Sequence, residues 1–230
     1  MTRPKGLIIA IDGPAGVGKS TVGKMVAERV GYSFVSTGRM YRALAWKALE
    51  LGADLGDGEG LAALAGRLKW EFPKGAGPEA DVALDGRRLE RELTDERVGK
   101  ASSGIALLAG VRLFMKDMQR KAGEDGGVVM EGRDIGSNVF PDAELKIYLD
   151  ASPRARAERR VSQLRGQGLQ ADFDQILDFI LKRDAQDSGR KINPLVKAPD
   201  AHYLDSTSVP REAVVDAIVE LFERAAKTPR

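Results

Sequence analysis

A glycine-rich loop between an apolar run and a helical pattern constrains the fold of this chain most. Gly13–Ser20 reads Gly-Pro-Ala-Gly-Val-Gly-Lys-Ser, which fits the pattern of glycine, four residues and Gly-Lys-Ser/Thr. The run Leu7–Ile11 before it is typical of a buried parallel strand, and helical spacing of apolar residues starts at Ser20. Such a loop turns backbone N–H groups and a helix N-terminus toward phosphate oxygens. The sequence therefore predicts a bound nucleoside triphosphate, and a plain glycine turn is the weaker interpretation.

The positions of this loop have distinct expected roles. Lys19 can reach the β- and γ-phosphates of ATP, the Ser20 hydroxyl can bind Mg²⁺, and Thr21 offers a second hydroxyl. The expected ATP-binding residues are Gly13, Pro14, Ala15, Gly16, Val17, Gly18, Lys19, Ser20 and Thr21. Mg²⁺ is the expected cofactor, with Ser20 as its protein ligand and ATP as co-substrate.

The composition excludes several other classes of protein. The 230 residues are 43% hydrophobic, which suffices for one α/β domain with insertions. With no cysteine and the single histidine His202, the chain has no disulfide, thiolate metal site or histidine metal cluster. Its 36 basic and 34 acidic residues give a net charge of +2, which argues against a nucleic-acid-binding arm. No apolar run is long enough for a signal sequence or a membrane span, so we expect a cytoplasmic protein without a membrane partner.

The order of the elements predicts an α/β fold in which helices cover both faces of a parallel sheet. Strands are expected at Leu7–Ile11, Tyr32–Val35, Gly127–Met130, Leu145–Leu149 and Tyr203–Asp205. Helices are expected from Ser20 to Gly31, at Thr37–Leu49, as one or two helices within Glu96–Lys121, after Ser152–Pro153, at Phe173–Leu181 and at Glu212–Ala225. The residues after Leu181 are expected to form a charged loop. An Asp85–Gly86 turn between strand-like arms predicts a small antiparallel insertion around Leu68–Leu89.

Three arginine-containing clusters lie outside the phosphate loop. They are Ser36–Arg42 (Ser-Thr-Gly-Arg-Met-Tyr-Arg), Glu131–Gly136 (Glu-Gly-Arg-Asp-Ile-Gly) and Arg183–Arg190 (Arg-Asp-x-x-Asp-x-x-Arg). An arginine can hold a phosphate with two hydrogen bonds, and the neighbouring groups can bind a sugar or a base. A solvated charged turn would explain any one cluster alone. Solvated turns do not explain all three clusters together, because the second cluster directly follows a strand. Open α/β sheets bind ligands at the carboxyl ends of their strands.

These motifs, in this order, resemble bacterial cytidylate kinases of the P-loop nucleoside monophosphate kinase family. The resemblance also includes Val-Phe-Pro-Asp-Ala after the second cluster and Leu-Asp-Ser-Thr near the end, and it covers nearly the whole chain. It implies a (d)CMP kinase that transfers the γ-phosphate of ATP to CMP or dCMP, giving CDP or dCDP and ADP in pyrimidine nucleotide metabolism. It further implies a single domain over residues 1–230, with an acceptor-binding insertion at about 38–105. Neither a nucleic acid nor a membrane is expected as a partner.

The resemblance also assigns the acceptor site residue by residue. The expected CMP-binding residues are Thr37, Tyr41, Arg42, Ser103, Arg112, Arg133, Asp134, Arg183, Asp187 and Arg190. Lys19, Arg133, Arg183 and Arg190 are the expected catalytic residues. Among these, Asp134, Ser103 and Arg112 would face the cytosine ring. Ser103 is assigned by counting back from Arg112 without a gap, and Ser102 is the neighbouring alternative.

The late segment from Arg154 to Lys191 carries nine basic and six acidic residues, which favours a lid at about 158–192 that closes over the transferring phosphate. Arg156, Arg159 and Arg160 would lie on one helix face of it. The segment has Gln186 and Ser188 where some relatives have arginines, which would weaken its hold on phosphates.

Other functions are still possible on the sequence. Another P-loop small-molecule kinase, such as an adenylate or shikimate kinase, shares the phosphate loop but has different acceptor motifs. A nucleotide-dependent switch that binds partners would need segments that the sequence does not reveal. A GTPase loses support because no Asn-Lys-x-Asp motif is present. We expect a monomer that binds only small-molecule nucleotides.

Overall fold

Five parallel strands form the central sheet of the computed structural model, which describes residues 3–73 and 77–227. Their order is β2-β6-β1-β7-β8, and they comprise β1 (Ile8–Asp12), β2 (Ser33–Ser36), β6 (Val128–Gly132), β7 (Leu145–Asp150) and β8 (His202–Asp205). Strand β1 lies in the middle, where Asp12 pairs in register with Gly132 of β6. Because all five strands are parallel, their carboxyl ends meet at one edge of the sheet. The predicted strands and the parallel sheet are confirmed.

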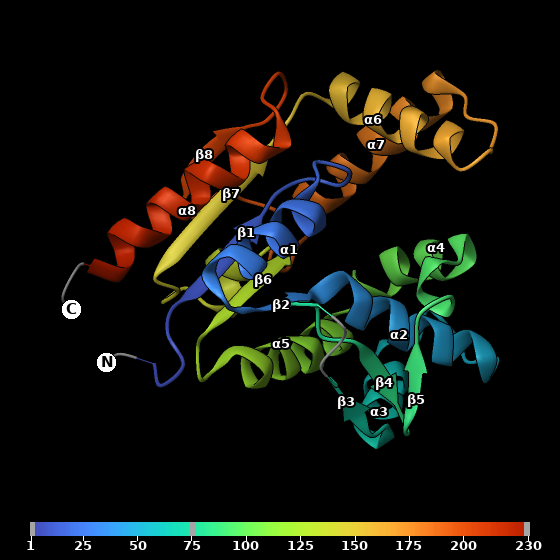
Figure 1. The fold of residues 1–230 in the computed structure, drawn as a ribbon. Coiled ribbons are helices and arrows are strands. Elements are labelled where there is room, and N and C mark those ends of the chain that lie inside the picture. The colour runs from blue at the N-terminus through green and yellow to red at the C-terminus, as the bar shows by residue number, and fades with distance from the viewer. Residues whose placement is uncertain (1–2, 74–76, 228–230) are drawn as a thin grey trace.

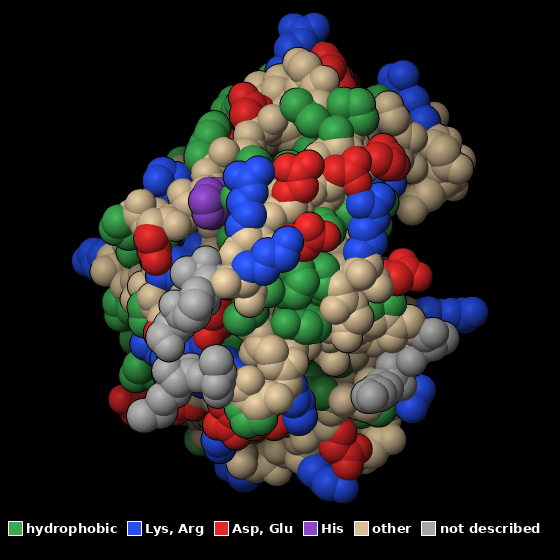
Figure 2. Space-filling view, turned by 60° about the vertical axis from the view of Figure 1, so that its left-hand side comes forward, with side chains coloured by type: hydrophobic (Ala, Val, Ile, Leu, Met, Phe, Trp, Pro, Cys, Tyr) green, Lys and Arg blue, Asp and Glu red, His purple; other side chains and the backbone are tan. Residues whose placement is uncertain are grey.

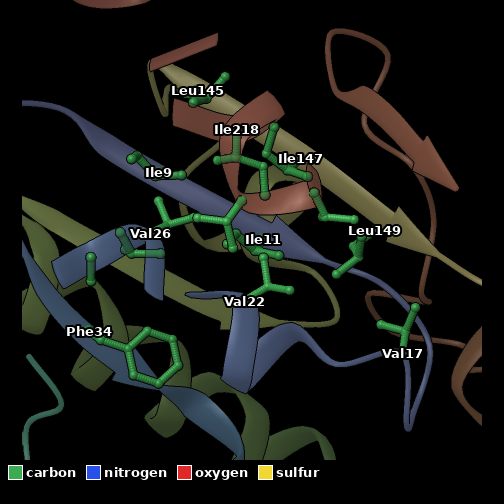
Figure 3. Close-up of a cluster of buried hydrophobic side chains, with 14 of the residues drawn as sticks. Ile9, Ile11, Val17, Val22, Val26, Phe34, Leu145, Ile147, Leu149 and Ile218 are labelled. Atoms are coloured by element: carbon green, nitrogen blue, oxygen red, sulfur yellow. The ribbon is translucent and has the colours of Figure 1, made fainter. Parts of the chain in front are cut away.

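Helices cover both faces of this sheet, as predicted (Figure 1). On one face, α1 (Lys19–Val30) and α8 (Arg211–Lys227) pack on strand residues such as Ile9, Ile11 and Ile147, together with Val22 and Ile218 (Figure 3). On the other face, a cluster that includes Ile8 and Met130 packs against the one-turn π-helix η2 (Ile135–Val139). Burial of these aliphatic side chains on both sides explains why the strands read as continuous apolar runs.

A second group of elements is inserted between β2 and β6. Its helices are α2 (Thr37–Glu50), α3 (Gly58–Arg67), α4 (Glu96–Ile105) and α5 (Ala109–Gly123), with the 3₁₀ turn η1 (Glu92–Thr94) before α4. Its antiparallel sheet consists of β3 (Trp70–Glu71), β4 (Val82–Leu84) and β5 (Arg87–Leu89). Asp85 and Gly86 have φ angles of 52° and 80°, as the tight hairpin turn requires. The predicted antiparallel insertion is confirmed, although residues 74–76 of its range lie outside the described residues.

Helix α3 is the element that the sequence did not predict. It begins within the glycine-rich stretch Gly52–Gly60, which we interpreted as a surface connection. The Asp57 side chain accepts a hydrogen bond from the Gly60 N–H and so caps the first turn. Leu61, Leu64 and Ala65 then pack into the core of the insertion. Capping and burial together compensate for the low helix propensity of glycine.

The late polar segment is more helical than predicted. Helix α6 (Pro153–Gly166) begins as expected, with the Ser152 hydroxyl accepting from the Ala155 N–H. Helix α7 (Phe173–Ser188), however, continues seven residues beyond Leu181, so the charged loop expected there is wrong as far as Ser188. The continuation is polar because Asp184 pairs with Arg156 at 2.6 Å and Asp187 with Arg133 at 2.8 Å. A helix face buried through ion pairs lacks the apolar periodicity by which helices are predicted.

Within residues 3–73 and 77–227, no single helix is both long and apolar enough to cross a membrane. Helices α4 and α5 meet those criteria only as a pair, with a bend of 102° between them.

Candidate active site

A cleft of about 540 Å³ opens at the carboxyl ends of β1, β2 and β6. The phosphate loop and the start of α1 form one wall, and α2, α4 and α5 contribute another. Helix α7 closes it from the side of the late segment. In Figure 2 the molecule is hollowed at its right-hand edge, and basic and acidic side chains are interspersed on the face drawn. His202, purple there, is exposed and takes no part in the cleft.

The cleft brings together most of the residues predicted to bind nucleotides. Those on its walls are Ala15, Gly16, Gly18, Lys19, Ser20, Thr21, Thr37, Tyr41, Arg42, Arg112, Arg133, Asp134, Arg183 and Arg190. Gly13, Pro14 and Val17 lie behind the loop surface, and Asp187 is buried beneath the arginines. Ser102 lies on the wall, whereas the predicted Ser103 does not. The hydroxyls of both serines donate to the Gly99 carbonyl, at 2.8 and 3.1 Å.

The phosphate loop has the backbone geometry of an anion-binding cradle. Gly13 and Gly18 have φ angles of 152° and 100°, which side chains rarely permit. A Cβ at Gly13 would lie 2.0 Å from the Leu149 carbonyl oxygen, so only glycine fits beside β7. The Lys19 ammonium donates to the Gly13 and Pro14 carbonyls at 2.8 and 2.7 Å. The loop therefore holds a cation inside a ring of backbone groups, where phosphate oxygens can meet it.

The position of Lys19 makes its charged form unfavourable in free energy. The residue is 5% exposed, and burial together with the nearby Arg133 lowers the pKa of its ammonium to about 7. Glu131 and Asp12 oppose this shift only in part. Near neutral pH, Lys19 is thus poised between its charged and neutral forms, and an arriving polyphosphate would favour the charged form.

ATP binding at pH 8 should therefore take up about one proton, because a lysine with a pKa near 7 is mostly neutral at that pH and becomes charged beside phosphate. Isothermal titration calorimetry in buffers of different ionisation enthalpy measures this number directly. In Lys19→Met the uptake should vanish. Buffer-independent heats in the parent protein would show that Lys19 is already charged without nucleotide.

Glu131 is a site residue for which no role was predicted, although it is the first residue of the Glu-Gly-Arg-Asp motif. It is 6% exposed at the end of β6, and its Oε1 accepts from the Ser20 hydroxyl at 3.0 Å and from the Ser36 hydroxyl at 2.6 Å. Its carbonyl accepts from the Thr37 hydroxyl at 2.9 Å. Its position at the end of a strand beside the phosphate loop was the signal that could have identified it.

The oxygens of Ser20 and Glu131 suit a hard cation such as Mg²⁺, which prefers hydroxyl, carboxylate, phosphate and water ligands. Among the described residues, no group of three or more His, Cys, Asp or Glu side chains could hold a metal ion alone. Mg²⁺ binds proteins through one or two side chains plus substrate phosphates, so the donor set fits this cation.

Asp187 organises the arginines on the acceptor side. Its carboxylate accepts from Arg133 Nε at 2.8 Å and from the Arg190 guanidinium. Burial by itself raises the pKa of Asp187, but Arg133 and Arg190 outweigh burial and hold that pKa below its usual value. The buried Nε atoms of Arg183 and Arg190 have no hydrogen-bond partner within the described parts of the chain. Arg183 differs from Arg190 and Arg133 because, among the described residues, its guanidinium forms no ion pair with Asp187. Burial and the neighbouring Arg133 lower the pKa of Arg183 to about 10.

A third buried carboxylate, that of Asp134, lies on the wall of the cleft. Asp134 Oδ2 accepts from Arg112 Nη2 at 2.7 Å and from Asn138 Nδ2 at 2.9 Å. Both Asp134 and Arg112 are less than a tenth exposed. Burial raises the pKa of the nearby Tyr41 to about 12, so its phenol remains a hydrogen-bond donor at neutral pH. This end of the cleft offers donors and acceptors of fixed orientation, as recognition of a base requires.

Two arginines expected on the lid face are engaged elsewhere. Arg156 is 2% exposed and donates to the carbonyls of Ala151 and Ala15, at 2.9 Å each, as well as to Asp184. The Arg159 guanidinium donates to the hydroxyl and carbonyl of Ser206. Arg156 therefore joins α6 to the phosphate loop and to α7, and Arg159 joins α6 to the residue that follows β8.

Comparison with known proteins gives a consistent result. The family model described as cytidylate kinase matches residues 9–224. A cytidylate kinase from Pelotomaculum thermopropionicum is 45% identical over 211 residues, covering 92% of this chain and 93% of the relative. One from Bacillus pumilus is 42% identical over 223 residues, covering 97% and 99%. A solved structure of an uncharacterised protein from Eubacterium ventriosum shares the fold, with a TM-score of 0.53 and 14% identity over 94% of this chain and 98% of that one.

Proposed function

This chain belongs to the cytidylate kinase family, and we propose that it transfers the γ-phosphate of ATP to CMP or dCMP, giving ADP and CDP or dCDP. One observation supports this most: a single cleft joins the phosphate loop to a cluster of arginines and to a buried Asp–Arg pair. A kinase that acts on a nucleoside monophosphate needs these three parts, namely a donor cradle, an acceptor clamp and a base-reading end.

On the donor side, the loop from Gly13 to Thr21 would hold the ATP phosphates. Its backbone N–H groups and the N-terminus of α1 attract the phosphate oxygens, and Lys19 would exchange its two carbonyl partners for them. Ser20 and Glu131 would hold Mg²⁺, Glu131 through its carboxylate. When bound, Mg²⁺ neutralises part of the charge of the terminal phosphates.

On the acceptor side, Arg42, Arg133 and Arg190 would hold the phosphate of CMP, with Thr37 and Tyr41 as further hydrogen-bond donors. In the structure Asp187 holds Arg133 and Arg190 in place, and its carboxylate can also accept from a sugar hydroxyl. The attacking phosphate oxygen of CMP is largely ionised at neutral pH, so the chain needs no general base. Alignment of the two phosphates and neutralisation of their charge are then the work of the site.

At the base-reading end, Asp134 would accept from the exocyclic amine of cytosine, and Arg112 would donate to its ring acceptors. Uracil presents a carbonyl where cytosine has the amine, so the carboxylate would repel it. Either neighbouring serine could complete the pattern; Ser102 lies on the cleft wall and Ser103 is adjacent to it.

We propose two segments around this site as its moving parts. The insertion at about 38–105 would carry the acceptor, and a lid at about 158–192 would close over the phosphates. Figure 1 supports this division, because the α6–α7 pair and the group of α2 and α4 lie on opposite sides of the end of the central sheet. Gln163 of α6 and Ser102 of α4 both line the same cleft. A monomeric, cytoplasmic enzyme remains a prediction.

The function is tested by ADP release with a panel of nucleoside monophosphates, where CMP and dCMP should greatly exceed UMP and AMP. In the same assay, Asp134→Asn should lower the CMP-to-UMP ratio of kcat/KM by roughly ten- to a hundredfold, which corresponds to ~1–3 kcal/mol of discrimination. Asparagine keeps a hydrogen bond to Arg112 but can also donate to the uracil carbonyl.

Asp178→Asn is the matched control, because Asp178 pairs with the exposed Lys182 away from the cleft. It should leave the ratio unchanged. An unaltered ratio in Asp134→Asn would remove Asp134 as the base reader, and a preference for AMP or for a non-nucleotide acceptor would indicate another small-molecule kinase.

A further inference from the structure

Asp12 is a buried carboxylate that the proposed mechanism does not use. It ends β1, one residue before the phosphate loop, and is 5% exposed. It is not among the residues that line the cleft. Asp12 therefore cannot be assigned contact with a nucleotide, and its place between two functional segments needs another explanation.

Both oxygens of Asp12 are engaged by the segment that follows the base-reading carboxylate. Oδ1 accepts from the Ile135 N–H and Oδ2 from the Gly136 N–H, both at 2.7 Å. These N–H groups open the η2 turn, whose first donors have no partner within the turn itself. A carboxylate 123 residues away in the sequence thus caps η2, whose N-cap residue is Asp134. Both hydrogen bonds are charge-assisted.

None of the other hydrogen bonds of Asp134 within the described residues reaches the central strand. Its side chain is held by Arg112 and Asn138, and its carbonyl accepts from the N–H groups of Asn138 and Val139. In the described part of the chain, all the backbone partners of Asp134 belong to η2 itself. Apolar residues of η2 pack in a cluster with residues of β1, and α5 bonds to the end of η2. Asp12 adds the two hydrogen bonds that fix the first N–H groups of η2 to the central strand.

The same strand carries the donor site. Asp12 is joined to Gly13, whose carbonyl accepts from Lys19, and it pairs in register with Gly132 beside Arg133. Lys19 and Asp134 both act on the Asp12 carboxylate electrostatically. The Asp12 side chain thus joins the strand that leads into the donor loop to the two residues that follow the base reader.

We propose that Asp12 is a positioning residue for selection of the acceptor base, which acts through the backbone of residues 135–136 on Asp134. The proposal rests on the proposed function, because it presumes that Asp134 reads cytosine. With asparagine at position 12, one acceptor oxygen is replaced by an amide that opposes a backbone N–H. The start of η2 then keeps only one of its two hydrogen bonds to the side chain at position 12, and Asp134 loses its alignment with the base.

The test compares the parent, Asp12→Asn, Asp134→Asn and the double variant by their kcat and KM for CMP, UMP and ATP. In Asp12→Asn, the KM for CMP should rise about tenfold and the CMP-to-UMP ratio of kcat/KM should fall, while the KM for ATP changes less than about twofold. The double variant should discriminate no worse than Asp134→Asn alone, because both substitutions remove the same interaction. Asp57→Asn is the matched control: its carboxylate also accepts from a backbone N–H, at the start of α3.

Equal losses with CMP and UMP, or losses that multiply in the double variant, would reduce Asp12 to a purely structural residue and overturn the inference. If Asp12→Asn does not fold, Asp12→Ser, which keeps one acceptor oxygen, takes its place. Its CMP-to-UMP ratio should fall, though less than that of Asp134→Asn, and an unchanged ratio overturns the inference as well. The two proposals fail differently. A parent that does not prefer CMP refutes base selection altogether, whereas a parent that prefers CMP, with discrimination lost in Asp134→Asn but kept in Asp12→Asn, refutes only the role of Asp12.

Discussion

Replacing Lys19 with methionine should lower kcat/KM for phosphoryl transfer by about a thousandfold or more, ~4 kcal/mol of transition-state stabilisation. The ammonium lies in the cradle of the phosphate loop, where its only hydrogen-bond partners among residues 3–73 and 77–227 are the carbonyls of Gly13 and Pro14. Charge that develops on the transferring phosphate in a water-poor site is stabilised strongly by such a fixed cation. Steady-state kinetics with ATP and CMP measures the loss.

The Lys19→Met variant should still fold. The lowered pKa of Lys19 shows that burial disfavours its charge, so methionine removes that cost even as it loses two hydrogen bonds. The midpoint of thermal unfolding is therefore expected within a few degrees of the parent. Arg29→Met, at the exposed end of the same helix, is the control and should alter neither quantity. A folded Lys19→Met protein with normal kcat would contradict the proposed donor site.

The phosphate loop could be predicted residue by residue because its chemistry is local. Eight consecutive positions hold the glycines, the lysine and the serine, and strand β1 and helix α1 adjoin them. The fold class followed for a related reason: the apolar strands are buried on both faces, which leaves a pattern that one window of sequence contains.

What the sequence could not reveal depends on contacts between distant segments. Asp187 meets Arg133 across 54 positions, and this pairing turned an expected loop into the last turns of α7. Glu131 and Asp12 are ordinary acidic residues until the sheet brings them beside Ser20 and Ile135. Which of Ser102 and Ser103 faces the cleft likewise depends on how α4 is rotated; Ser102 lines it in the structure, and contact of Ser103 with the base stays a prediction.

Arg183→Met should lower kcat by roughly a hundred- to a thousandfold and, without nucleotide, should make the protein more stable. The two effects have one cause. Arg183 lies close to Arg42, Arg133 and Arg190, with Asp187 as the nearby carboxylate, and burial and this crowding lower the pKa of its guanidinium to about 10. A buried cation without a partner for its Nε costs free energy in the empty protein.

An anion that binds beside Arg183 would offset this free-energy cost. Of the acceptor arginines, Arg133 and Arg190 already pair with Asp187, and Arg42 donates to the Leu93 and Asp95 carbonyls, so Arg183 is the cation most available to the transferring phosphate. Arginines placed on that group contribute strongly to phosphoryl transfer. Methionine would thus remove both the strain of the empty site and the stabilisation of the transition state.

Thermal unfolding and steady-state kinetics on the same preparation test this pair of opposite effects. The unfolding midpoint of ligand-free Arg183→Met should rise by a few degrees, and the gain in midpoint on adding ATP and CMP should shrink. Lys182→Met, one residue earlier on α7, removes an exposed cation that pairs with Asp178 and should leave kcat unchanged. A variant that is less stable than the parent yet still fast would mean that Arg183 serves the fold, and the transferring phosphate would then have to be neutralised by Arg133 or Arg190.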